Sequence, residues 1–278
     1  MTRPAQGRHA RPRTPLTARA VTSPAGATVL GALTVAGLLG AGSAQAATVG
    51  ARPPAVGLAG SQSEAALPTL PAAFGHSTQV IAVQATGSDA VVTVWQRTGT
   101  HWAALFSTTA ARIGSHGITD GATRTQGTDT TPSGVYSITQ GFGVGANPGT
   151  KMPYHKVTST DWWVEDPTSA YYNQMRTSTQ GGFHLTEAGD DGSEHLINYP
   201  TQYNNALVIN FNTAPAVVGR GAGIFLHDLG PQAGPTAGCV ALPAAVMTQV
   251  MKWIDPAQHP VISIVPAAHR TTLAQARL

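Results

Sequence analysis

Cysteine is almost absent from this sequence, because Cys239 is the only one in 278 residues. One cysteine cannot form a disulfide within the chain, although exported domains normally use cysteines in such pairs. Three interpretations stay open: a disulfide between two chains, an inert buried thiol, or a thiol kept for chemistry. From the residue type alone, the inert thiol is favoured, because free cysteine packs like a small hydrophobic residue.

Acidic residues are absent from the first 46 positions, which read as an export signal. An apolar run at 26–40 precedes the small residues "AQA" at 44–46, so we predict a signal peptide over 1–46 with cleavage after Ala46. An uncleaved anchor is the alternative, since no charge lies between Arg19 and Arg52, but the run is short for a span of roughly 20 residues. No cysteine stands at the cleavage site and no arginine pair precedes it, which argues against lipidation and twin-arginine export. The basic residues of this segment are Arg3, Arg8, Arg11, Arg13 and Arg19.

A basic surplus is also absent once this segment is removed. Of the 16 Lys and Arg, 11 then remain against 13 Asp and Glu, a formal charge of −2. A nucleic-acid partner is therefore not supported. We predict a secreted or cell-wall protein that has no stable membrane span after signal cleavage.

The rest of the chain divides by composition. Residues 47–71 are rich in Ala, Gly and Pro and predict a flexible linker, residues 72–268 are long enough for one domain, and 269–278 form a tail. Within the domain, β-branched runs separated by turn residues predict strands, the first three in a meander. The predicted strands are 78–85, 90–97, 102–106, 133–138, 161–166, 206–211, 223–228 and 261–265. No internal repeat is present.

One helix is predicted from Pro243 to Ile254. Its apolar residues recur at the spacing of a single helical face, Pro243 suits the first helical position, and Asp255-Pro256 ends the run. The domain is therefore expected to be mostly β with at least one packed helix.

A histidine and the cysteine frame a short loop. His227 ends the predicted strand 223–228, and Cys239 follows twelve residues later, after "DLGPQAGPTAG". A neighbouring imidazole can take the proton of a thiol and make it nucleophilic. Gly238 frees the backbone to turn, so that amides near Gly238 and Cys239 could point at an oxyanion. Asp228 is a poor partner for His227, because strand alternation sends it to the opposite face.

The segment "IFLHDLGPQAGPTAGCVALP" resembles the active-site signature of the L,D-transpeptidase (YkuD-type) catalytic domain family, in which a strand histidine is followed by a loop and then by Ser or Thr, any residue, Gly and Cys. "TPSGVYSI" at 131–138 resembles the family's TPxGxY segment. "WWVEDPTSAYYNQ", "EHLINYPTQYNNALVINFN" and "GRGAGIFLHD" resemble secreted actinobacterial members.

The resemblance implies a β-sandwich-like domain that acts on peptidoglycan stem peptides. It implies that Cys239 attacks the diaminopimelate carbonyl of a tetrapeptide donor and expels D-Ala, with His227 as base and then acid, and that an amine of a neighbouring stem accepts the acyl group in a 3→3 cross-link. Gly238 and the Cys239 amide then line the oxyanion site, and Thr236 occupies the Ser/Thr position.

One position departs from this pattern. The family usually carries arginine two residues after the cysteine, where this chain has Ala241, so we predict that Arg220 in the "GRGAG" turn replaces it at the substrate. A different substrate and weak activity stay open as alternatives. Tyr136 is predicted to hold the strand beside the site or to contact substrate, and Gly134 to be structural.

Other functions are less favoured. His184, with Asp190, Asp191, Glu194 and His195, matches no familiar ligand spacing, so we predict no metal, and nothing indicates an organic cofactor. Trp162 and Trp163 should point to opposite faces, with core packing favoured for both.

A papain-like protease is disfavoured, because there the cysteine precedes its histidine by a long stretch. A hydrolase using the same dyad, and a wall-binding module without catalysis, stay open as alternatives.

Overall fold

The computed structural model describes residues 74–267, and every structural statement below refers to them. The predicted signal peptide, linker and C-terminal tail lie outside the described residues. Within 74–267, no helix combines the length and apolarity needed to cross a membrane.

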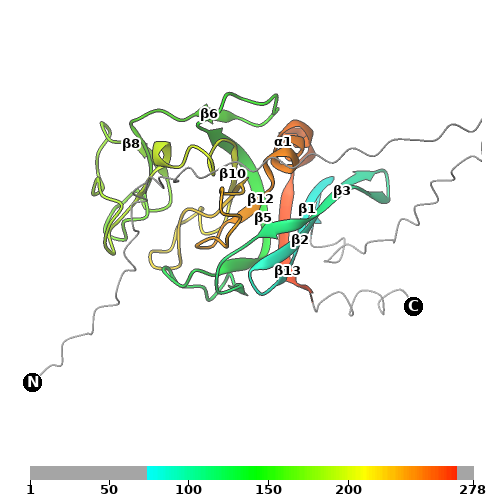
Figure 1. Ribbon diagram of the computed structural model, residues 1–278, viewed down its shortest axis with the longest axis horizontal. Coiled ribbons are helices and arrows are strands. Elements are labelled where there is room, and N and C mark those ends of the chain that lie inside the picture. The colour runs from blue at the N-terminus through cyan, green and yellow to red at the C-terminus, as the bar shows by residue number, and fades with distance from the viewer. Residues whose placement is uncertain (1–73, 268–278) are drawn as a thin grey trace, which may run out of the picture. The chain divides into compact units, whose positions relative to one another are not determined.

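The chain first forms the predicted meander of three antiparallel strands, β1 (Gln79–Thr86), β2 (Asp89–Thr98) and β3 (His101–Arg112). The two hairpin turns place Gly87 and Gly99 at φ of 57° and 60°, a conformation that glycine adopts without steric cost. The last strand of the fold, β13 (Val261–Pro266), pairs in parallel with β1, so the two ends of the domain, cyan and red in Figure 1, lie side by side.

A long strand, β5 (Thr131–Gly143), closes the sheet. Its first half pairs with β13, and its second half pairs with β10 (Ala206–Ile209). From β10 the sheet continues through β11 (Phe225–Asp228) and β12 (Val240–Leu242) back to β3. Eight strands therefore form a closed ring, which leaves few unpaired strand edges. The short strands β4 (Ile118–Asp120) and β6 (Tyr154–Lys156) flank β5 in parallel.

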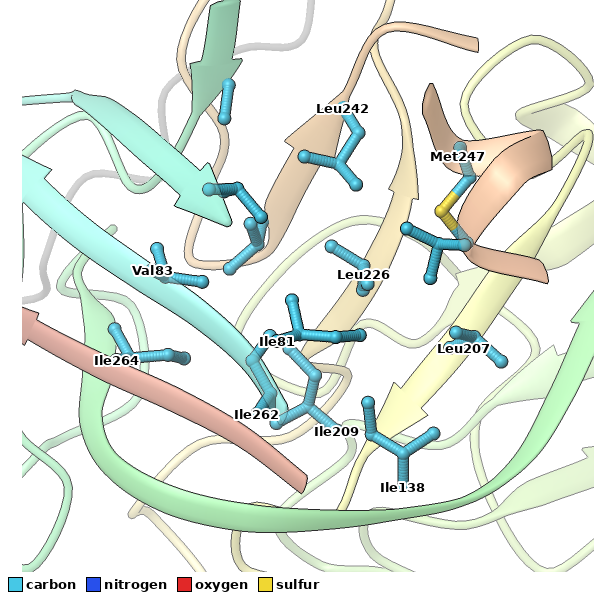
Figure 2. Close-up of a cluster of buried hydrophobic side chains, with 14 of the residues drawn as sticks. Ile81, Val83, Ile138, Leu207, Ile209, Leu226, Leu242, Met247, Ile262 and Ile264 are labelled. Atoms are coloured by element: carbon cyan, nitrogen blue, oxygen red, sulfur yellow. The ribbon is translucent and has the colours of Figure 1, made fainter. Parts of the chain in front are cut away.

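The main hydrophobic core fills this ring. Alternate residues of the strands point inward, as period 2 requires, and they meet side chains of the single helix α1 (Ala244–Trp253) (Figure 2). Fully buried members include Ile81, Val83, Ile138, Leu207, Ile209, Leu226, Leu242, Met247, Ile262 and Ile264. Because each of these side chains is removed from water, the interior of the ring is the main apolar contribution to stability.

A second, smaller layer lies outside the ring against β10 and β11. It contains the three-stranded antiparallel sheet of β7 (Asp161–Trp163), β8 (Met175–Thr177) and β9 (Glu194–His195), followed by the 3₁₀ turn η2 (Leu196–Asn198). A cluster of buried aromatic residues joins this layer to the ring, formed by Phe142, Trp163, Tyr203 and Phe225 with smaller apolar neighbours. We call it the aromatic cluster.

The predicted secondary structure agrees with these elements in type. The mostly β fold with one packed helix is confirmed, and α1 buries Met247, Val250 and Met251 along its predicted stripe. Pro243 caps the helix with extended ψ of 136° instead of forming its first turn. The predicted strand at 161–166 ends at Trp163, because the chain then turns at Asp166, whose carboxylate accepts from the Thr168 amide at 2.8 Å.

The two adjacent tryptophans lie in different surroundings, as strand alternation predicts. Trp163 stacks near Phe142 in the aromatic cluster and donates from Nε1 to Asn173 at 2.9 Å. Trp162 stacks on the His195 ring with 4.3 Å between centroids. Both indoles are largely buried, at 2% and 8% exposure, so packing accounts for each.

Candidate active site

The predicted dyad lies at two parallel neighbouring strands: His227 belongs to β11, and Cys239 directly precedes β12. Leu226 pairs with Val240, and His227 pairs with Ala241. Leu226 and Val240 point into the ring core, so their neighbours His227 and Cys239 lie on the other face, toward the aromatic cluster. The fold thus places both predicted residues toward the same side of the sheet.

Cys239 is a free, partly buried thiol that packs against the aromatic cluster. Its Sγ donates to the Gly223 carbonyl and accepts from the Phe225 amide, each at 3.3 Å. Burial raises the pKa of the thiol, and the Glu194 and Glu165 carboxylates raise it further, while the Phe225 amide and Arg124 oppose them. The resting thiol is therefore protonated.

His227 is buried and held in one orientation. Its Nδ1 lies 2.7 Å from the Asp228 backbone carbonyl, which can only accept, so Nδ1 carries the proton and Nε2 keeps a lone pair. Burial lowers the pKa of His227 from 6.5 to about 4, against the opposing effect of the bond to the Asp228 carbonyl. The imidazole is therefore neutral near pH 7 and able to accept a proton.

Tyr203 lies beside both members of the dyad. Its ring meets His227 edge to face at 5.5 Å and belongs to the cluster against which Cys239 packs. Its hydroxyl donates to Glu194 at 2.6 Å. Among the hydrogen bonds of residues 74–267, none joins Cys239 to His227, since each is bonded to backbone. The resting arrangement is a neutral thiol and a neutral imidazole on one face, not an ion pair.

Hydroxyl groups hold the loop before the cysteine. Thr236 Oγ1 donates to the Cys239 carbonyl at 2.7 Å and accepts from the Gly238 amide at 3.1 Å. The Thr236 backbone bridges to Gly114, and Thr131 Oγ1 lies 3.5 Å from the same Cys239 carbonyl. Gly238 has φ of 143°, which strongly favours glycine. Thr236 therefore supports the loop, and the Gly238 amide is already hydrogen-bonded.

Ala241, where the resembling family has arginine, lies between two strands. It pairs with His227 on β11 and with Arg112 on β3. Arg112 donates from Nε to the Ala233 carbonyl at 3.0 Å, and so ties the loop before Cys239 to β3. The backbone carbonyl of Arg220, the predicted replacement, accepts from Arg124 Nη1 at 3.1 Å. Its predicted contact with substrate stays a prediction.

Tyr136 occupies a structural position. Its hydroxyl donates to the Ser133 carbonyl at 2.6 Å, and its ring meets Phe211 edge to face at 5.6 Å. Any Cβ at Gly134 would lie 2.7 Å from the Tyr136 hydroxyl oxygen, so that glycine makes room for the ring. These contacts support the packing role that the sequence indicated for Tyr136.

The acidic and histidine residues considered for a metal are distributed over separate contacts. His184 lies 2.9 Å from Asp166 and 3.1 Å from Asp191. His195 Nε2 instead lies 2.7 Å from the Ser159 carbonyl, and Glu194 accepts from Tyr203. His184, Asp191, Glu194 and His195 therefore each have a partner within the fold.

Several groups near the thiol could not be found from sequence. The orienting group of His227 is a main-chain carbonyl, which every residue has, so no residue type signals it. Three further groups come from segments far from the dyad in the sequence: Tyr203, Glu165 and Glu194. They meet the dyad only because β7 pairs with β9 and β10 pairs with β11. Arg124 reaches the loop from the segment between β4 and β5.

The domain is mostly β and holds a thiol and a neutral imidazole toward one side of its sheet. The chain matches the YkuD family, the L,D-transpeptidase catalytic domain, over residues 82–262. That match spans more than half of the chain, so the chain belongs to the L,D-transpeptidase catalytic domain family, which acts on peptidoglycan.

Other comparisons are distant. No curated protein is similar enough in sequence to be matched. Among solved structures, Bd1075 of Bdellovibrio bacteriovorus is similar with 15% identity and a TM-score of 0.36 over 72% of this chain and 55% of that chain. The helical cell shape determining protein Pgp2 of Campylobacter jejuni has 12% identity and a TM-score of 0.36 over 68% of this chain and 48% of that one. The chain thus spans about half the length of these proteins, and no functional statement follows from similarity at this level.

Proposed function

We propose that the protein is an exported cysteine acyltransferase that forms 3→3 cross-links between peptidoglycan stem peptides. The observation that supports this most is the placement of His227 on β11 and of Cys239 directly before the neighbouring β12, toward the same side of the sheet, inside a domain of the L,D-transpeptidase family. Peptidoglycan stems are the substrate class, and no cofactor enters the proposed reaction.

In the first half-reaction, Cys239 Sγ attacks the carbonyl carbon that precedes the terminal D-Ala of a tetrapeptide donor. The thiol proton passes to His227 Nε2, a thioester forms, and the broken amide bond releases D-Ala, which takes the proton from His227. In the second half-reaction, an amine of a neighbouring stem attacks the thioester. A new amide forms, and the thiol is regenerated.

The resting geometry defines what must change before attack. The thiol donates to the Gly223 carbonyl, so the Cys239 side chain has to turn from Gly223 toward His227 for the proton to be transferred. Because the Gly238 amide is bonded to Thr236, the Cys239 amide is the donor that we assign to the developing oxyanion. Thr236 holds that amide in place through the Cys239 carbonyl.

The test is incubation of the purified protein with a tetrapeptide muropeptide, followed by mass spectrometry. We expect loss of D-Ala and a cross-linked dimer, and we expect Cys239→Ser to lose at least about a thousandfold in rate. Tripeptide monomer without dimer would instead identify a hydrolase, in which water takes the acyl group. Unchanged muropeptide that still binds to the protein would identify a wall-binding module, and full activity of Cys239→Ser would exclude the mechanism.

Export is a separate part of the proposal and rests on the charge and apolar pattern of residues 1–46. The N-terminus of the protein recovered from the culture medium or the cell wall should begin at Ala47. A protein that retains residues 1–46 in the membrane fraction would instead support the uncleaved anchor.

A further inference from the structure

The segment 219–223, "GRGAG", approaches the thiol with three glycines, each at positive φ: 81° for Gly219, 118° for Gly221 and 63° for Gly223. Gly223 supplies the carbonyl to which Cys239 donates. A Cβ on Gly221 would collide with the Arg124 guanidinium, and a Cβ on Gly223 would collide with the Glu165 carboxylate. The missing side chains thus allow two opposite charges to lie against this segment, next to the cysteine.

Arg124 is held rigidly beside the residue before the thiol. Its side chain is 5% exposed, Nε donates to the Thr130 carbonyl at 2.8 Å, and Nη1 donates to the Arg220 carbonyl. The guanidinium carbon lies 5.7 Å from the centre of the Phe211 ring. Its remaining nitrogen, Nη2, faces Gly238. A Cβ added to Gly238 would lie 3.0 Å from this nitrogen. A fixed positive charge is therefore built directly behind the peptide that leads into Cys239.

Glu165 lies against the same glycine segment, at Gly223. It follows β7, and its carboxylate covers Gly223, the residue whose carbonyl holds the thiol proton. Its backbone amide is fixed by Ser193 Oγ at 3.1 Å. In a partly desolvated site such a carboxylate opposes ionisation of a thiol, whereas a guanidinium favours it.

We propose that Arg124 and Glu165 are positioning residues of opposite charge that set the reactivity of Cys239, with Arg124 stabilising the thiolate and Glu165 holding the resting thiol neutral. This inference rests on the proposed role of Cys239 as nucleophile. Arg124 would also supply the positive charge that the family arginine provides and that Ala241 cannot. It comes from a different segment than the predicted Arg220.

The other charged or titratable groups around the thiol do not replace this pair. His227 on β11 is neutral near pH 7, Tyr203 is bonded to Glu194, and Glu194 on β9 adds a second negative charge. Among the groups that act on the thiol, Arg124 therefore provides the positive charge that opposes the two carboxylates.

The test is the pH dependence of Cys239 alkylation by iodoacetamide, which reacts with the thiolate. We expect Arg124→Gln to move the midpoint up by about one pH unit and to slow alkylation at pH 8 about tenfold. Arg124→Lys keeps the positive charge but loses the hydrogen bonds to two carbonyls. Its alkylation rate at pH 8 should stay within about threefold of the wild-type rate. Glu165→Gln should move the midpoint down.

Arg176 offers a matched control, because its guanidinium also bonds two backbone carbonyls, those of Gly181 and Gln180, and lies over an aromatic ring, that of Tyr171. Arg176→Gln should leave the alkylation midpoint unchanged. A profile of Arg124→Gln that coincides with wild type would overturn the proposal, as would an Arg124→Lys as slow as Arg124→Gln.

If circular dichroism shows that Arg124→Gln does not fold, Glu165→Gln decides the matter: a midpoint that stays or rises would overturn the proposal. Alkylation needs no peptidoglycan. The proposed transpeptidation can therefore fail in the muropeptide assay while the charge effect on the thiol holds. Transpeptidation can equally be observed while the charge effect on alkylation is absent, so the two failures are distinguishable.

Discussion

The two faces of β11 and β12 use the same backbone for different purposes. On the inner face, Leu226, Val240 and Leu242 are completely buried in the ring core. On the outer face, His227 and Cys239 lie between the ring and the aromatic cluster, with polar and charged groups within reach. The inner face stabilises the fold, and the residues proposed for chemistry lie on the outer face, so changes on the two faces should have separable effects.

The largest expected effect on stability comes from the inner face. Leu226→Ala should lower the free energy of unfolding by about 2–5 kcal/mol, because it removes buried methyl groups and leaves a cavity. Cys239→Ala on the outer face should cost under about 1 kcal/mol while abolishing turnover. Denaturant unfolding of both variants, alongside the muropeptide assay, measures this difference between the two faces. Equal losses of unfolding free energy in the two variants would contradict it.

A second effect follows from His227, whose pKa falls from 6.5 to about 4 on folding. The unfolded state then binds the proton first, so this contribution to stability is complete above pH 6.5 and is lost as the pH falls through about 4. Its full size is about 3 kcal/mol. Denaturant titrations of His227→Gln should lack this loss.

Asp228, next along the strand on the opposite face, acts in the reverse direction. Burial raises its pKa from 3.8 to about 6, so its contribution is present below pH 3.8 and is lost as the pH rises through about 6. The two neighbours therefore oppose each other between about pH 4 and 6. Asp228→Asn should show a steeper loss of stability on acidification than wild type, and a shallower loss would contradict this assignment.

The smallest effect is expected away from the thiol. Tyr136→Phe removes one hydrogen bond, to the Ser133 carbonyl, and should lower the free energy of unfolding by about 1 kcal/mol. Turnover and KM for the muropeptide should stay as in wild type. A raised KM with unchanged stability would restore the substrate-binding role that was the alternative for this residue.

Sequence patterns predicted the elements better than their arrangement. Alternating β-branched runs located β1, β2, β5, β10, β11 and β13, and the spacing of apolar residues located α1, because these signals are local. The closure of the ring by β5 could not be predicted, since pairing with both β13 and β10 depends on contacts between distant segments. The same holds for the short strands of the outer layer.

The sequence by itself determined which residues could do chemistry: one unpaired cysteine, a histidine twelve residues before it, and a glycine and a threonine positioned to shape the loop between them. The tertiary structure decided how these residues are tuned. It oriented His227 through the Asp228 carbonyl, bonded Gly238 to Thr236, and brought Arg124 and Glu165 against a glycine segment beside the thiol. The physical reason is that proton affinity depends on burial and on charges near in space, and neither can be read from neighbours in the chain.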